Sequence, residues 1–215
     1  MIGHGERHAG GDRDAVIRWA WLYDLGLRVF WRRGKRWRDG LLDVLDLQPG
    51  QRVLDVGSGT GRLAFALADR VAPGGSVDGI DAAGEMVARA EQNNRRQRRR
   101  VTFTTARAQQ LPFPDASFDA VICTLALHHV APDDRAAAIG EMRRVLRSGG
   151  RVLVAEFDGA GGGLTPLARL HSRHPEHAGS LDAAVRLLGA AGFTGVTRGS
   201  TTIAGIGQVV ATRAG

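Results

Sequence analysis

The chain of 215 residues contains a single cysteine and no run of eighteen apolar residues. One cysteine excludes an internal disulfide, and the position of Cys123 in an apolar segment predicts a buried, unreactive thiol. Without a long apolar run, a membrane-spanning helix is not expected. Residues 1–8, Met-Ile-Gly-His-Gly-Glu-Arg-His, also lack the apolar core of a secretory signal. We therefore expect a cytoplasmic protein.

Acidic residues are fewer than basic residues. The chain has 22 Asp and Glu and 29 Lys and Arg, which gives a formal net charge of +7. Five arginines lie within residues 95–100, at the end of a predicted helix, where cations complement the helix dipole. We interpret them as a solvated surface. Contact with RNA, or peripheral contact with an anionic membrane at its inner face, stays an alternative, and the Trp- and Arg-rich residues 18–38 favour the membrane.

Two common nucleotide-binding patterns are missing. There is no Walker lysine, and Arg62 stands where a dinucleotide fingerprint has its third glycine, so a nicotinamide dehydrogenase fits poorly. Residues 53–61 instead read Val-Leu-Asp-Val-Gly-Ser-Gly-Thr-Gly, and Asp81 closes the next predicted strand. Such glycines let the backbone bend off a buried strand and approach a ligand, and the carboxylate can accept both hydroxyls of a ribose. This pattern predicts a pocket for a nucleoside that carries an amino-acid tail.

The hydrophobic pattern alternates between strands and helices. Short apolar or β-branched segments predict strands at residues 52–57, 76–81, 101–105, 118–123, 150–156, 194–200 and 208–212. Apolar residues at three- and four-residue spacing predict helices at residues 14–33, 37–46, 61–71, 84–98, 133–147 and 181–191. This alternation predicts an α/β fold with a doubly wound, mostly parallel sheet covered on both faces. Ligands of such sheets bind beyond the carboxyl ends of the strands, so the turns after the first five strands should surround one crevice.

Three further segments carry a resemblance to a known family. They are residues 110–121 (Gln-Leu-Pro-Phe-Pro-Asp-Ala-Ser-Phe-Asp-Ala-Val), 125–130 (Leu-Ala-Leu-His-His-Val) and 141–157. The glycine-rich segment is the fourth. Together they resemble class I S-adenosylmethionine-dependent methyltransferases, in the branch that includes the ubiquinone and menaquinone C-methyltransferases. The resemblance covers about residues 19–157. It implies a Rossmann-like sheet of seven strands with the last strand antiparallel, and S-adenosyl-L-methionine as the cofactor.

The same resemblance implies one domain overall with a helical lid at its start. Residues 1–12 are expected to be disordered, residues 13–48 to form the N-terminal helical lid, and residues 49–215 to form the methyltransferase domain. Tyr23-Asp24 and Trp37 resemble the segment that folds over the cofactor in the quinone-methylating enzymes. Tyr23 would then cover the sulfonium, since an aromatic face attracts a cation, and it is a candidate catalytic residue. An amphipathic packing helix is the alternative.

The resemblance also implies which residues hold the cofactor. Backbone groups of the glycine turn would hold its methionine end, with Asp55 positioning the turn and Asp81 binding the ribose. Thr124 and Leu125 would contact the amino-acid tail through their backbone. The predicted cofactor-binding residues are Tyr23, Asp55, Gly57, Ser58, Gly59, Gly61, Asp81, Ala82, Met86, Arg107, Ala108, Gln109, Thr124 and Leu125.

At the residues predicted to bind the adenine, the chain departs from the family that it resembles. Ala82 and Met86 would flank the ring with apolar surface, although Met86 is equally well interpreted as a core residue of its helix. The family has an acceptor for the adenine amino group where Arg107 stands, and an arginine offers only donors. That hydrogen bond must then be made by another group, for which Gln109 is the candidate, or be lost.

Histidines supply the candidates for chemistry. His128 and His129 follow the fourth core strand, and imidazole suits a general base or substrate ligand at neutral pH. We take His128 as the candidate catalytic residue, with a structural role at the edge of the core as the alternative. His171, His174 and His177 recur every three residues, but Pro175 interrupts that helix and no acid or thiol completes a site, so no metal is expected.

The function that these features predict is methyl transfer from S-adenosylmethionine to a small apolar or lipid-like acceptor, at carbon, oxygen or nitrogen, by in-line displacement. A module that binds the cofactor without catalysis is the alternative from another class. Methylation of nucleic acid is less favoured, because Thr124-Leu125-Ala126 lacks the Asn/Asp-Pro-Pro-aromatic element of amino-methylating DNA enzymes.

Overall fold

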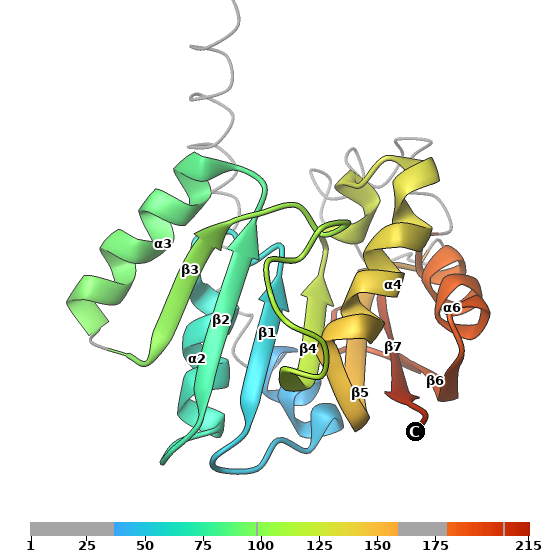
Figure 1. Cartoon of the computed structure of the whole chain (residues 1–215), viewed down its shortest axis with the longest axis horizontal. Coiled ribbons are helices and arrows are strands. Elements are labelled where there is room, and N and C mark those ends of the chain that lie inside the picture. The colour runs from blue at the N-terminus through green and yellow to red at the C-terminus, as the bar shows by residue number, and fades with distance from the viewer. Residues whose placement is uncertain (1–36, 98, 159–179, 204) are drawn as a thin grey trace, which may run out of the picture. The chain divides into compact units, whose positions relative to one another are not determined.

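In the computed structural model, the predicted strands pair into one seven-stranded sheet (Figure 1). The strands are β1 (Arg52–Val56), β2 (Ser76–Asp81), β3 (Val101–Thr105), β4 (Phe118–Thr124), β5 (Leu146–Phe157), β6 (Phe193–Ser200) and β7 (Ile206–Arg213). Their order is β3-β2-β1-β4-β5-β7-β6. β7 runs antiparallel to both of its neighbours, and the other neighbouring strands pair in parallel. The predicted Rossmann-like sheet is therefore confirmed.

The structure describes residues 37–97, 99–158, 180–203 and 205–215. The chain divides into two compact units, Met1–Trp37 and Arg38–Gly215, and only Trp37 of the first is described. The helix predicted at residues 14–33 and the predicted disorder of residues 1–12 therefore lie outside the described residues. The limits of the predicted lid and domain stay predictions.

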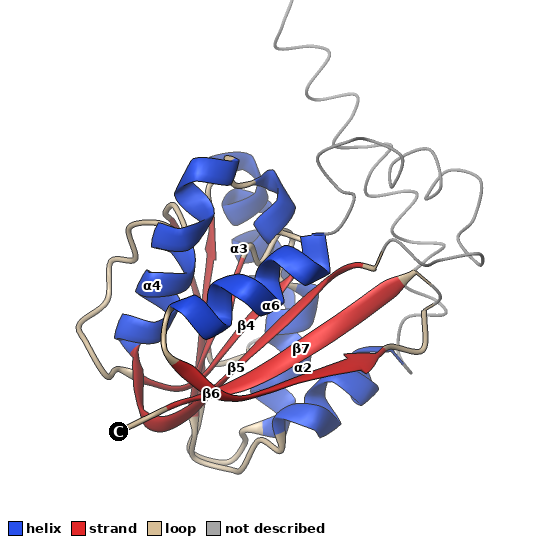
Figure 2. Cartoon of the chain, turned by 90° about the vertical axis from the view of Figure 1, so that its right-hand side faces the viewer, coloured by secondary structure: helices blue, strands red, loops and turns tan. Residues whose placement is uncertain are grey.

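The described helices flank the sheet on both faces. They are residues 37–45, α2 (Arg62–Arg70), α3 (Gly84–Gln97), α4 (Arg135–Val145) and α6 (Ser180–Ala190), with short 3-10 helices η1 (Leu127–His129) and η2 (Pro132–Asp134). In Figure 1, α4 lies in front of the sheet and α2 behind it. α6 packs across β5, β6 and β7 (Figure 2). Within the described part of the chain, no helix has the length and hydropathy needed to cross a bilayer.

The largest difference from the predicted boundaries lies between α4 and β5. The sequence predicted a helix to residue 147 and a strand from residue 150, whereas α4 ends at Val145 and β5 begins at Leu146. Leu146 has extended backbone angles (φ −70°, ψ 142°), and it pairs with Phe118 at the start of β4. The apolar side chain of Leu146 fits a helix or a strand equally well, so strand pairing decides its conformation.

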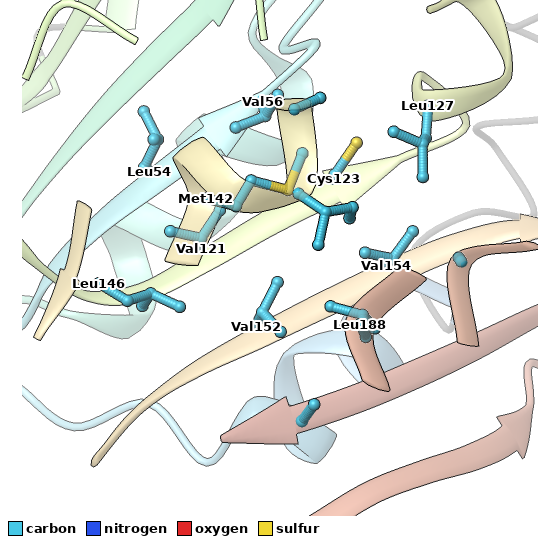
Figure 3. Close-up of a cluster of buried hydrophobic side chains, with 14 of the residues drawn as sticks. Leu54, Val56, Val121, Cys123, Leu127, Met142, Leu146, Val152, Val154 and Leu188 are labelled. Atoms are coloured by element: carbon cyan, nitrogen blue, oxygen red, sulfur yellow. The ribbon is translucent and has the colours of Figure 1, made fainter. Parts of the chain in front are cut away.

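The core forms where α4 and α6 meet one face of the sheet. Ala138, Ile139, Met142 and Val145 lie on one side of α4 at helical spacing and are fully buried. They belong to one cluster with side chains of the sheet and of α6 (Figure 3). Cys123 is part of this cluster, and burial raises the pKa of its thiol well above the ordinary value, with the Glu156 carboxylate adding to the effect. The predicted burial of this cysteine is confirmed.

Arg144, near the end of α4, holds the loop that leads into β4. Its guanidinium donates to the carbonyls of Leu111 (3.1 Å) and Phe113 (2.8 Å) and to Asp115 Oδ1 (2.7 Å). It also binds both carboxylate oxygens of Glu141, at 2.6 and 2.8 Å, and this contact keeps the pKa of Glu141 below its ordinary value. One side chain thus supplies hydrogen-bond donors to the carbonyl groups of a loop that has little secondary structure of its own.

We expect Arg144→Ala to lower the free energy of unfolding by about 2–3 kcal/mol, because several charge-assisted hydrogen bonds to a partly buried loop are lost together. Arg144→Lys should recover less than half of this, since an ammonium cannot reproduce the planar fork of donors. Urea unfolding followed by far-UV circular dichroism measures both. Arg186→Ala, at an exposed position of α6, is the control and should change little. Equal stability of Arg144→Ala and Arg186→Ala would contradict the expected role of Arg144.

Candidate functional site

The glycine-rich turn follows β1 at the point where the strand order reverses. β1 pairs with β2 on one side and with β4 on the other, so the chain leaves for β2 and β3 and later returns to β4. In open α/β sheets such a switch point is where ligands bind, beyond the carboxyl ends of the strands. This rule places the predicted ligand site at the turns beside the switch point, which follow β1, β2 and β4.

Gly57 opens this turn with a backbone conformation that side chains disfavour. Its φ is +76°, and a Cβ added to it would lie 2.3 Å from the Cβ of Ala126. Its N–H and that of Ser58 both donate to the carbonyl of Ile80, each at 2.8 Å. The turn after β1 is thus fixed to the end of β2 and packs directly against the turn after β4. Gly61 closes it as the N-cap of α2.

Gly59 lies at the open side of the turn. Its φ is +51°, and a Cβ added to it would meet no described atom within 4 Å. Its N–H donates to Asp81 Oδ2 at 2.8 Å, and Asp81 Oδ1 accepts the N–H of Ala83 at 2.9 Å. The carboxylate predicted to bind a ribose is therefore fixed beside the glycine turn. An ionised carboxylate has about four acceptor sites, so capacity remains for two hydroxyl groups.

Asp55 places a second carboxylate beneath the turn. It lies in β1 with 1% of its surface exposed. Burial raises the pKa of Asp55 to about 7, and repulsion from Asp81 adds to the rise, while the N–H of Ala64 opposes it. Among the described residues, no donor reaches either oxygen in standard hydrogen-bonding geometry. A buried acid with this pKa would be stabilised in its ionised form by a cationic ligand.

We expect the stability of the protein to fall between pH 4 and pH 7 by about 4 kcal/mol because of Asp55. In this range the unfolded chain ionises the group, with its ordinary pKa of 3.8, while the folded chain keeps it protonated up to about pH 7. Below pH 4 both states are protonated, and the folded state incurs no penalty. Asp55→Asn should remove this dependence.

The measurement is urea unfolding of the wild type and of Asp55→Asn from pH 4 to pH 8. The difference between their free energies of unfolding should change with pH up to about pH 7 and then level off. Asp133→Asn, which alters an exposed aspartate, serves as the control. A difference that is constant with pH would show that Asp55 titrates normally in the folded protein.

The residues predicted to surround the adenine lie around the turns after β2 and β3. Ala82 is exposed, and Met86 is half-buried in the first turn of α3. Arg107 is exposed, and Ala108 packs against the core cluster. Gln109 Nε2 donates to Asp134 Oδ2 at 3.2 Å. This contact uses the amide N–H of Gln109, so its carbonyl oxygen has the acceptor capacity that Arg107 lacks.

The exit of β4 is strained. Leu125 has φ +51°, a left-handed conformation that is unusual for a leucine, and its N–H donates to the carbonyl of Ala155 at 2.8 Å. Thr124, the last residue of β4, is half-buried beside it. Such a conformation costs about 1–3 kcal/mol and is concentrated at functional sites. This conformation turns the chain beside β5 directly after Thr124. The contacts of Thr124 and Leu125 with the amino-acid tail of the cofactor stay a prediction.

His128 is bound to a carboxylate that sequence reasoning missed. Its Nδ1 lies 2.7 Å from Glu156 Oε2, and both side chains are almost fully buried. The other oxygen of Glu156 accepts the backbone N–H groups of Leu127 (2.9 Å) and His128 (3.3 Å). A lone glutamate inside the apolar segment Val-Leu-Val-Ala-Glu-Phe is the sequence signal that could have identified it, since a buried carboxylate needs partners.

The remaining predicted residues lie outside the described part of the chain. Tyr23 and the three histidines at 171, 174 and 177 belong to segments that the structure does not describe. Among the described residues, no group of three His, Cys, Asp or Glu is placed to hold a metal ion.

The described site fits S-adenosylmethionine. The cofactor carries two positive groups, a sulfonium and an ammonium, and the site holds the Asp55 carboxyl group, which a nearby cation would keep ionised. Gly59 leaves room for close approach to the backbone, and the Asp81 carboxylate beside it is an acceptor of the kind that a ribose diol requires. Met86, half-buried in the first turn of α3, stays a predicted apolar neighbour of the purine.

Comparison with known proteins supports this interpretation. Residues 53–150 match a family described as a methyltransferase domain. The chain is 38% identical to a demethylmenaquinone methyltransferase of Beutenbergia cavernae over 163 residues, which are 70% of this chain and 64% of that protein. It is 42% identical to a demethylmenaquinone methyltransferase of Thermus thermophilus over 122 residues, 57% of this chain and 54% of that protein. The chain therefore spans between half and two thirds of these relatives.

A solved structure shows the same arrangement. A SAM-dependent methyltransferase of Methanosarcina mazei superposes with a TM-score of 0.61 at 26% identity, covering 78% of this chain and 94% of that one. The family resemblance predicted from the sequence is thus confirmed: residues 53–150 match a methyltransferase domain, and most of the chain is similar to a solved SAM-dependent methyltransferase.

Proposed function

We propose that this chain is an enzyme that transfers the methyl group of S-adenosylmethionine to a ring carbon of a small, lipophilic hydroquinone. The observation that carries the proposal is the hydrogen bond that joins the open Gly59 turn to Asp81, because this arrangement suits an adenosyl group. The curated relatives at 38% and 42% identity are named for a demethylated menaquinone, and this name supports the choice of acceptor.

The demands of this reaction agree with the residues of the site. The bound cofactor supplies an activated methyl group on a sulfonium, so the main task of the chain is to hold the acceptor in line with it. Alignment alone contributes about 7–11 kcal/mol in favourable cases. The rigid turns after β1, β2 and β4 suit that task, because each is fixed by hydrogen bonds to a neighbouring element.

Two measurements, made one after the other, test the proposal. Titration calorimetry with S-adenosylmethionine and its demethylated product should show binding in the micromolar range. The labelled cofactor is then incubated with a short-chain, demethylated naphthoquinone kept reduced by dithionite, and the extracted product is analysed by mass spectrometry for a methyl group on carbon. Absence of binding would contradict the whole proposal. Binding with no transfer to any reduced quinone or phenol would instead favour a module that only binds the cofactor.

Peripheral contact with an anionic membrane is part of the same proposal. A quinone-type acceptor resides in lipid, and Arg95, Arg96 and Arg100 are exposed near the end of α3. Basic residues near an anionic surface contribute about 1 kcal/mol each. Sedimentation with vesicles containing phosphatidylglycerol should therefore capture the protein, and replacing these three arginines with glutamine should weaken it. Equal capture by neutral vesicles would contradict an electrostatic contact.

A further inference from the structure

We infer that a groove on the last strands of the sheet binds a small organic carboxylate, with Arg151 at the anionic end of the ligand and Gln208 at an acceptor on its other end. The groove has a volume of about 220 Å³, and β5, β6, β7 and the helix at residues 37–45 line it. None of the described residues that we predict to bind S-adenosylmethionine is part of this lining. The groove is therefore a second site, separate from the proposed methyl-transfer site.

The alternation of β7 places the groove on one face of the sheet. Val209 and Ala211 belong to the core cluster, and α6 packs on that face (Figure 2). Gln208, Val210 and Thr212 alternate with them and line the groove. Since successive side chains of a strand point to opposite faces, the groove lies on the face of β7 that α6 does not cover.

Arg151 supplies the positive charge of the groove. Its Nη1 donates to the carbonyl of Leu45 at 2.9 Å, and no carboxylate in the described part of the chain pairs with it. Arg198, the other arginine of the lining, already pairs with Asp158 and Asp182. The remaining donors of the Arg151 guanidinium form the planar fork that binds a carboxylate well.

Gln208 presents an amide donor that the protein leaves unused. The residue is 8% exposed, and its Oε1 is enclosed with no partner among the described residues. Its Nε2 is not enclosed, and it lies beside Gly199 of the lining, where an added Cβ would be 3.4 Å away. Burying an amide without partners is costly, so an apolar side chain here would give a more stable fold. An acceptor on a ligand would give this amide the partner that it lacks.

The spacing of the two polar residues sets the form of the ligand. Arg151 lies opposite Thr212, and Gln208 precedes Thr212 by four residues on β7, which corresponds to roughly 14 Å along the strand. Val210 lies between these two positions, and Val44 adds apolar surface to the lining. The groove is smaller than the roughly 300–1,000 Å³ of sites for drug-sized ligands. A short carbon chain with a carboxylate at one end and an acceptor at the other therefore matches it.

The test is an NMR titration of the nitrogen-labelled full chain with adipate and with hexanoate. Both acids have a carbon chain of the same length, and only adipate has an acceptor at its second end. Adipate should bind in the millimolar range or tighter and shift the side-chain amide of Gln208 and the backbone signals of Thr197 and Thr212. Hexanoate should bind about tenfold more weakly, because it cannot accept from the Gln208 amide.

Two variants assign the two ends of the ligand. Arg151→Gln removes the charge and should weaken both acids about tenfold or more. Gln208→Met keeps the size of the side chain and should reduce adipate to the affinity of hexanoate, without lowering the stability of the fold. Arg186→Gln removes the same charge from α6, outside the groove, and should leave both affinities unchanged. Gln208→Met keeps the test decisive even where Arg151→Gln is unstable through its lost contact with Leu45.

Three results would overturn the inference. The first is an adipate titration that shifts no residue of the groove. The second is equal weakening by Arg151→Gln and Arg186→Gln, which would indicate general attraction to a chain of net charge +7. The third is an equal affinity for adipate and hexanoate in the wild type. Each of these leaves methyl transfer intact, and absence of S-adenosylmethionine binding would leave the groove intact, so the two proposals fail separately.

Discussion

Replacing Gly57 with alanine is expected to lower the free energy of unfolding by about 2–5 kcal/mol and to weaken cofactor binding at least tenfold. Two costs combine at this position. The φ of +76° is a left-handed conformation that costs an L-residue about 1–2 kcal/mol, and the new Cβ would overlap that of Ala126 at 2.3 Å. Relieving the overlap must push the turns after β1 and β4 apart, and both turns are predicted to touch the cofactor.

A compensating change separates the two costs. Gly57→Ala combined with Ala126→Gly removes the overlap and leaves only the backbone strain, so the double variant should recover part of the stability and of the affinity. Gly189→Ala is the control: this glycine lies in α6 with open space at its Cβ, and alanine there should stabilise by about 0.5–1 kcal/mol. Thermal unfolding and calorimetry report both quantities. A Gly57→Ala protein as stable as the wild type would show that the two turns can separate freely.

The cofactor side of the site was predictable because its signals are local in sequence. Residues 53–61 combine a buried strand with glycines at fixed spacing, and Asp81 ends the very next strand. The structure joins them by one hydrogen bond, from the N–H of Gly59 to Asp81. Parallel pairing of β1 with β2 brings the two strand ends together, and this pairing follows from the strand–helix alternation. The parallel part of the sheet and the approach of the glycine turn to Asp81 therefore followed from the pattern, whereas the antiparallel last strand and the cofactor came from the family resemblance.

The contact of His128 with Glu156 was not predictable, because it depends on the pairing register of segments that are distant in the sequence. His128 meets Glu156 only because β4 pairs with β5 so that Thr124 lies opposite Ala155. A shift of one residue in that register would turn the glutamate to the other face of the sheet. The contact of Gln109 with Asp134 likewise depends on tertiary structure, since it joins the loop after β3 to η2, 25 residues further along the chain. Sequence periodicity predicts that these segments exist, and it carries no information on which polar side chains they bring together.

The largest loss of cofactor affinity is expected from Asp81→Ala, for which we predict a dissociation constant about 100-fold higher. A carboxylate that accepts both hydroxyls of a ribose makes charge-assisted hydrogen bonds, and losing them costs about 3 kcal/mol in a partly buried site. The change also removes the acceptor of the N–H groups of Gly59 and Ala83, so the hydrogen bonds that fix the turn are lost. Asp81→Asn should not rescue binding, because one amide oxygen cannot accept from both N–H groups and its NH₂ group faces the other donor.

Asp78→Asn is the matched control for Asp81→Ala, because it removes a charge from the same strand three residues earlier, where Asp78 pairs with Arg52. Its affinity for S-adenosylmethionine should stay near that of the wild type. Asp81→Ala carries a second signature that a general loss of structure would not produce. The Asp81 charge helps to raise the pKa of Asp55, so its removal should lower that pKa and move the pH dependence of stability to lower pH. Weaker binding together with this shift would identify Asp81 as the charge that acts on both the cofactor and Asp55; normal affinity in Asp81→Ala would exclude it as the ribose ligand.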